Sequence, residues 1–119
     1  MITKEQKIIN MVKGDLPIKV MPNRQVLPKL KETFPKLDIT LETVFEIHSM
    51  LDNGNVGGIT CEICPLNFDK ATAKAVFFCS ITHFRVMVGE KHFTLLKKYS
   101  EDRIRDLKRQ NSFNPFFRR

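Results

Sequence analysis

The cysteine and histidine residues of the central segment have the spacing of a metal site. All three cysteines of the chain and one of its three histidines fall between residues 61 and 83. They are Cys61, Cys64, Cys79 and His83, in the pattern CxxC followed by CxxxH. Three thiolates and one imidazole are a common ligand set for structural zinc. The cluster therefore defines one candidate cofactor, zinc, and one candidate function, a small zinc- or thiol-dependent protein.

The residues around this quartet are typical of β-strands, which weakens the metal hypothesis. Residues 58–64 alternate apolar and polar side chains, and residues 75–86 are rich in β-branched and aromatic ones. In a strand each residue advances about 3.3 Å and successive side chains point to opposite faces, which puts Cys61 and Cys64 about 10 Å apart on opposite faces. The other two ligands would share a face but lie about 13 Å apart. We therefore expect no metal site and no cofactor, and inert thiols buried in a hairpin.

The sequence contains no motif of a known catalytic site. Ser80, His83 and His92 are not accompanied by a nucleophile elbow. A redox CxxC needs a helix directly after it, and no helical pattern follows Cys64. The glycine-rich loop at residues 54–58 precedes a strand, whereas phosphate-binding loops precede a helix. The sequence therefore assigns no catalytic residue and favours a protein that is not an enzyme.

Positive charge is concentrated near the C-terminus. The net charge is +7, and residues 85–119 hold ten Lys and Arg against four Asp and Glu, whereas residues 1–84 hold ten against nine. Such a block attracts an anionic partner, which would be nucleic acid, an acidic protein or a membrane surface. The candidate contacts are Lys97, Lys98, Arg103, Arg105, Lys108, Arg109, Arg118 and Arg119. The alternative is a solvated helix face that keeps the protein soluble.

Hydrophobic periodicity and capping residues predict four helices. Thr3 and Gln6 form a capping box for the first, and Pro28 suits the first turn of the second. The predicted helices span residues 3–13, 28–35, 41–52 and 90–110. Apolar residues at helical spacing, from Leu41 to Leu51, indicate the third helix. Ser100 and the acidic residues after it resemble a new N-terminus, which leaves open a break in the fourth.

These elements define an α+β domain. N-terminal helices, a central antiparallel hairpin and a long C-terminal helix follow one another, and residues 16–21 are a candidate third strand. Because Pro17 and Pro22 bracket that strand, we expect it at an edge or as an extended connection. The expected core is Ile8, Val12, Leu30, Phe34, Leu41, Val44, Phe45, Leu51, Ile59, Phe77, Ile81, Phe93, Leu96 and Ile104.

The chain is predicted to be one domain, residues 1–110, followed by a Phe- and Arg-rich tail, residues 111–119. No signal peptide and no apolar run long enough to span a bilayer is visible, so we expect a cytoplasmic protein without a transmembrane segment. An exposed hairpin edge or the tail could also pair two copies, which makes a structural homo-oligomer the third functional hypothesis.

Overall fold

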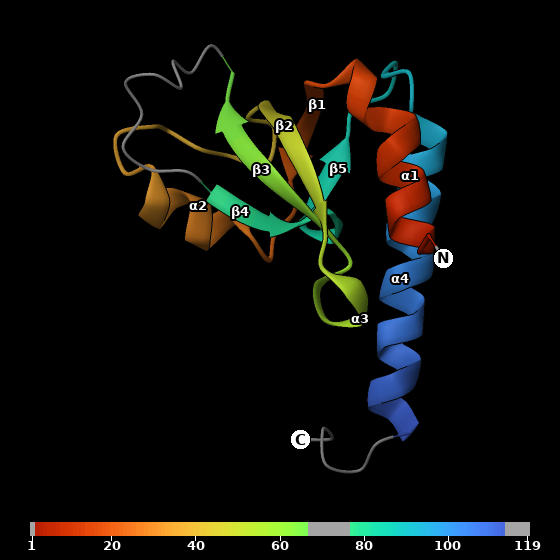
Figure 1. Ribbon diagram of the computed structural model, residues 1–119. Helices are drawn as coiled ribbons and strands as arrows, with labels where there is room; N and C mark the ends of the chain where they lie inside the picture. Colours follow the sequence, from red (N-terminus) through yellow and green to blue (C-terminus); the bar gives the residue numbers. More distant parts are fainter. Residues whose placement is uncertain (1, 67–76, 114–119) are drawn as a thin grey trace.

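The described chain is an α+β domain built from five strands, three helices and one further helical turn (Figure 1). The computed structural model describes residues 2–66 and 77–113. In chain order the elements are α1 (Lys4–Val12), the 3₁₀ helix η1 (Lys13–Asp15), β1 (Ile18–Pro22), α2 (Leu27–Thr33), β2 (Phe45–Asp52), the single turn α3 (Gly54–Gly57), β3 (Ile59–Pro65), β4 (Phe77–Ser80), the 3₁₀ helix η2 (Ile81–His83), β5 (Phe84–Val86) and α4 (Phe93–Phe113). The predicted fold class is confirmed, but the sheet is larger than a hairpin or three strands.

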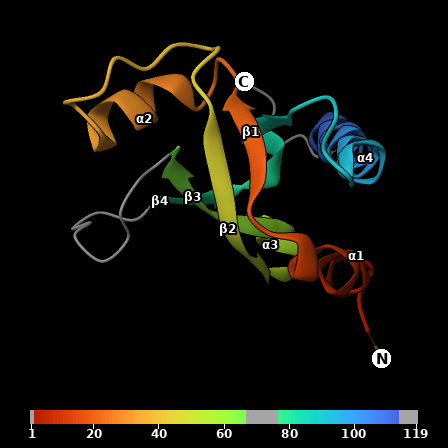
Figure 2. The same ribbon diagram turned by 90° about the horizontal axis from the view of Figure 1, so that it is seen from above.

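The five strands form one antiparallel sheet in the order β4-β3-β2-β1-β5. Its two edge strands, β4 and β5, are consecutive in the chain and are joined only by the three residues of η2. So short a connection requires the two edges to approach each other at that end, because a residue spans at most about 3.6 Å. The sheet is therefore curled, as the view from above shows (Figure 2).

Strand β1 lies inside the sheet, so its expected place at an edge is wrong. Val20 faces Phe45 of β2 on one side and Val86 of β5 on the other. The prolines do not interrupt the ladder because Pro17 precedes the strand and Pro22 is its last residue. A proline is tolerated where the strand ends, since the missing N–H costs no bond in the middle of the ladder.

Residues 45–52 form strand β2, so the helix predicted over residues 41–52 is wrong. Phe45 and Ile47 alternate toward the core as in any strand. Ile47 faces Ile63 and Ser49 faces Glu62, so His48 is an extra residue, a β-bulge. The bulge shifts the phase of the side chains that follow. The apolar residues of β2 therefore alternate with polar ones only up to the bulge. Together with the apolar residues before the strand, this interrupted alternation has the spacing expected of a helix.

The hairpin of β3 and β4 is confirmed, but the run predicted as one strand over residues 75–86 is two short strands. Of that run, residues 75 and 76 lie outside the described residues. The backbone turns at η2, where the Ser80 hydroxyl accepts a hydrogen bond from the Thr82 amide at 3.2 Å. This turn carries the chain from one edge of the sheet to the other.

The first two helices begin where their capping residues predict. Thr3 is the N-cap of α1, and its hydroxyl accepts a hydrogen bond from the Gln6 amide at 3.0 Å. Pro28 occupies the first turn of α2, where its missing N–H leaves no bond unmade. Figure 2 shows α2 at one end of the sheet, away from α1 and α4.

One core joins the helices to the strands. Phe45 lies near its centre, with ring centroids 6.3 Å from Phe34 and 6.2 Å from Phe84. The fully buried side chains include Val12, Val20, Leu30, Ile39, Phe45, Ile47, Ile59, Cys61, Ile63, Ile81 and Leu96. Of the predicted core, Leu51 and Ile104 are exposed instead, by 60% and 36%, and Leu41, Val44 and Phe93 are half-buried.

Helix α4 is continuous, so there is no break at Ser100. Its N-terminal turns pack beside η2 and β5, and its C-terminal turns extend past the strands and α3 (Figure 1). None of the helices in the described ranges is both long and apolar enough to cross a membrane.

Candidate binding cleft beside the C-terminal helix

Helix α4 is fixed to the rest of the domain by Tyr99. The buried tyrosine hydroxyl accepts a hydrogen bond from the Ile59 amide at 3.2 Å and donates one to Glu5 Oε2 at 3.0 Å. Burial, together with the bond to Glu5, raises the pKa of Tyr99 to about 12, so the hydroxyl keeps its proton as a donor. Leu96, one turn earlier, is fully buried. These contacts determine which face of α4 is turned toward η2.

Three of the predicted basic residues form ion pairs within α4. Lys97 Nζ lies 2.7 Å from Glu101 Oε2, and Lys98 Nζ lies 3.1 Å from Asp102 Oδ2. Arg105 Nη2 lies 3.3 Å from Asp102 Oδ1. The hydrogen bond from Lys98 holds the pKa of Asp102 below its usual value. These carboxylates offset part of the positive charge of α4.

The other predicted basic residues fall into three groups. Arg103 and Lys108 line a pocket between α4 and η2. Arg109 is exposed near the C-terminal end of α4. Arg118 and Arg119 lie outside the described residues. The basic residues that are close together in the sequence therefore lie in different surroundings in the structure.

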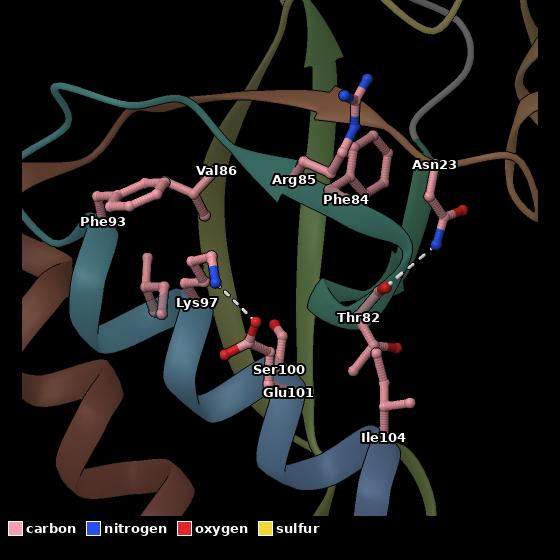
Figure 3. A pocket seen from close by; sticks show the side chains of 11 residues that line it. Asn23, Thr82, Phe84, Arg85, Val86, Phe93, Lys97, Ser100, Glu101 and Ile104 are labelled. Carbon is pink, nitrogen blue, oxygen red and sulfur yellow. Dashed lines mark hydrogen bonds and ion pairs between the residues drawn. The ribbon is translucent and has the colours of Figure 1, made fainter.

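An apolar recess of about 360 Å³ lies between α4 and β5 (Figure 3). It is lined by Asn23, Thr82, Phe84, Arg85, Val86, Phe93, Leu96, Lys97, Ser100, Glu101 and Ile104. Phe93 and Val86 lie next to each other at one end, and the Lys97–Glu101 ion pair lies at the rim (Figure 3). We call this space the apolar recess.

A basic pocket of about 320 Å³ adjoins the apolar recess. It is lined by Gln25, Gly57, Ser80, Thr82, His83, Arg103, Ile104, Leu107 and Lys108. No acidic side chain is among these lining residues, and two of them carry a permanent positive charge. Thr82 and Ile104 line both spaces, so the basic pocket and the apolar recess are adjacent along α4, and we call the two together the cleft.

His83 lines the basic pocket. It ends η2, and its Nδ1 atom is buried without a hydrogen-bond partner in the described residues. Desolvation lowers the pKa of His83, so its imidazole is neutral near pH 7. Because the His83 ring carries no charge, it does not repel the positive charges of Arg103 and Lys108 in the same pocket.

The cysteines of the quartet are held in β3 and β4. Cys61 and Cys64 lie three residues apart in β3, which places them on opposite faces, and both are buried. Cys79 of β4 lies directly opposite Cys61 on the neighbouring strand β3. Within residues 2–66 and 77–113, no three His, Cys, Asp or Glu side chains are grouped so as to hold a metal ion. Burial raises the pKa of the Cys61 thiol far above its usual value and that of Cys79 to about 12, which makes both poor nucleophiles.

Several residues of the cleft were missed by sequence reasoning. Asn23 and Gln25 precede α2, and their side chains join a cleft formed by residues 80–108. The Asn23 amide donates to the Thr82 carbonyl at 3.3 Å, and Arg85 donates to the Pro22 carbonyl at 3.2 Å. No spacing in the sequence signals these partners, because only the curled sheet brings the segments together.

The chain matches no family model, no curated protein and no solved structure in the three comparisons.

Proposed function

We propose that the protein is a non-enzymatic binding module that holds a nucleic acid through α4 and the basic pocket beside it. The observation that carries this proposal is the lining of the pocket. Arg103 and Lys108 converge there with His83, and no carboxylate is present among the lining residues. A concave site with one sign of charge concentrates the electrostatic field and favours an anion.

The projecting end of α4 extends the positive surface beyond the pocket. Arg109, which follows Lys108, is exposed near the C-terminal end of the helix. Contacts of Lys and Arg with phosphates supply most of the affinity of non-specific nucleic-acid binding, and they require no base recognition. A projecting basic helix next to a basic pocket fits a phosphate backbone better than it fits a single small anion.

Salt dependence of binding tests the proposal. A fluorescently labelled 20-mer of mixed sequence is titrated with protein, and anisotropy is followed from about 0.05 to 0.3 M salt. We expect the logarithm of the affinity to fall linearly with the logarithm of the salt concentration. Replacing both Arg103 and Lys108 by Gln removes two phosphate contacts and lowers the magnitude of that slope by about 1.5.

A charge-matched variant serves as the control. Lys98→Gln with Arg105→Gln removes an equal amount of positive charge from two side chains of α4 that do not line the basic pocket. We expect the control to change the slope less than the pocket variant does. Absence of binding at about 0.05 M salt, or binding that added salt does not weaken, would contradict the proposal.

A further inference from the structure

We infer that the cleft holds one nucleotide of a single-stranded nucleic acid, with its phosphate in the basic pocket and its base in the apolar recess. The inference rests on the proposed function and adds the form of nucleic acid that is bound. It follows from the difference between the two parts of the cleft: Arg103 and Lys108 line one part without any acidic residue, and the rings of Phe84 and Phe93 are in the lining of the other.

The two spaces are adjacent, as binding of a single nucleotide across them requires. Thr82 and Ile104 line both, and Ile104 is 36% exposed, so a ligand can reach the two spaces from solvent over this side chain. Each space, at about 360 and 320 Å³, falls within the range of about 300–1,000 Å³ that is usual for small-molecule sites. A ligand with an anionic part directly attached to a flat, weakly polar part fits this shape.

The charges fix the orientation of the nucleotide. The apolar recess is lined by Glu101, whose carboxylate repels a phosphate, and by two cations that already have partners: Lys97 is paired with Glu101, and Arg85 donates to the backbone carbonyls of Pro22 and Leu41. Arg103 and Lys108 lie in the basic pocket, where they attract one. The phosphate therefore belongs beside the two cations, and the base belongs beside Phe93.

The donors of the basic pocket suit a phosphate better than the carboxylate of an acidic protein. Of the lining residues that can donate hydrogen bonds, Arg103 and Lys108 belong to α4, Thr82 belongs to η2, and Gln25 belongs to the segment before α2. Donors on several sides match the tetrahedral oxygens of a phosphate, whereas a carboxylate is planar and is satisfied by a single guanidinium fork.

The apolar recess explains why the bound nucleic acid must be single-stranded. A base inside a duplex is paired and stacked on both sides, and it cannot enter a recess between a helix and a sheet edge. An unpaired base can enter and stack on the half-buried ring of Phe93, which lies beside Val86 (Figure 3). Stacking of this kind is tolerant of sequence and is the usual complement to a basic groove in proteins that bind single strands.

The test compares three labelled probes at one low salt concentration: a single-stranded 12-mer, the same sequence as a duplex, and a 12-mer whose central nucleotides are abasic. We expect the single strand to bind at least tenfold more tightly than the other two. Phe93→Leu keeps an apolar side chain but removes the aromatic face, and it should weaken single-strand binding about tenfold while leaving duplex binding unchanged.

A second variant covers the possibility that Phe93→Leu perturbs folding. Ile104 is 36% exposed and lies where the two spaces meet, so Ile104→Trp should fill the cleft and remove the preference for the single strand. Thr94→Trp is the matched control, since Thr94 is exposed on the same helix and lines neither space. Thermal melting of each variant confirms that it is folded.

The possible outcomes separate the inference from the proposed function. Equal, salt-sensitive binding of all three probes, unaffected by Phe93→Leu and Ile104→Trp, overturns the inference and leaves nucleic-acid binding intact. Binding of poly-glutamate as tight as that of the single strand overturns it in favour of an acidic protein. Failure to bind any of the probes overturns both.

Discussion

Tyr99 is the residue at which three elements of the fold meet. It belongs to α4, accepts a hydrogen bond from the amide of Ile59 in β3, and donates one to Glu5 of α1. The ammonium group of Lys4 lies 5.6 Å from the centre of its ring, within the range of a cation–π contact. Because α4 forms one wall of the cleft, the position of that wall depends on this side chain.

Replacing Tyr99 by Phe should lower the free energy of unfolding by about 1–3 kcal/mol. The variant keeps the buried ring but leaves the Ile59 amide buried without its acceptor, and such a group carries the full cost of desolvation. Glu5→Gln is the control, because its amide oxygen still accepts from Tyr99 and the change should be smaller. Urea unfolding of the three proteins measures the difference, and equal stability of Tyr99→Phe and the parent protein would show that the hydroxyl contributes nothing.

The two facing thiols, Cys61 and Cys79, should be unreactive in the folded protein. Their pKa values are raised by burial, so almost no thiolate is present at pH 8 to attack an alkylating reagent. We expect mass spectrometry to find both unmodified after treatment with a maleimide under native conditions, and both modified in denaturant. Rapid modification of either thiol without denaturant would mean that β3 and β4 separate readily.

At the scale of elements, the turn between β2 and β3 positions the helix wall of the cleft. Gly58 follows α3 with φ +60°, a conformation that favours glycine. Its carbonyl accepts a hydrogen bond from the Asn53 amide at 2.8 Å, which closes the turn. A Cβ at this position would lie 2.5 Å from Arg103 Nε and 2.7 Å from the Tyr99 hydroxyl. The absence of a side chain at Gly58 therefore allows α4 to approach the sheet.

Gly58→Ala should destabilise the fold by about 1–3 kcal/mol, because it combines backbone strain with a steric clash. Gly14→Ala is a matched control: no atom lies within 4 Å of a Cβ there, and its φ is not positive, so the effect should stay within about 1 kcal/mol. Thermal unfolding followed by circular dichroism distinguishes the two. Because Gly58→Ala should displace α4, we also expect this variant to bind a ligand in the cleft less tightly. An unchanged melting temperature in this variant would contradict the close approach of α4 to Gly58.

The elements that the sequence predicts well are those whose signals are local. Thr3 with Gln6, and Pro28, mark helix starts through contacts within one turn, and the alternation of residues 59–63 marks β3. Strand β2 was missed because one extra residue, His48, breaks its alternation. The bulge is visible only from the pairing of β2 with β3. Neighbouring residues in the sequence do not indicate which strands pair or in which register.

At the scale of the whole molecule, the cleft arises from the curl of the sheet. Its residues come from four parts of the chain: the segment before α2, the end of α3, residues 80–86, and α4. The sequence predicts a basic C-terminal helix but not that Arg103 and Lys108 face a pocket while Lys98 and Arg105 pair with Asp102. That separation depends on the rotation of α4, which Leu96 and Tyr99 determine by their burial.

The hydrogen bond between Thr3, at the start of α1, and Asp52, at the end of β2, should make the stability of the domain depend on pH below about pH 5. Asp52 accepts hydrogen bonds from the Thr3 hydroxyl and, at 2.8 Å, from the Gly54 amide, and both hold its pKa below the ordinary value of 3.8. As the pH falls, the unfolded chain therefore takes up the proton first. The contribution of Asp52 is complete above about pH 5 and is lost as the pH falls through the folded-state pKa.

Asp52→Asn tests this dependence directly. The variant should be less stable than the parent protein at pH 7, and the difference should shrink between about pH 5 and pH 2, where the parent loses its carboxylate. Asp38→Asn, which removes an exposed carboxylate in the loop after α2, is the charge-matched control. Urea unfolding at a series of pH values measures both. If the curves of Asp52→Asn and the parent run parallel down to pH 2, the carboxylate of Asp52 does not hold the N-terminus of α1 against β2.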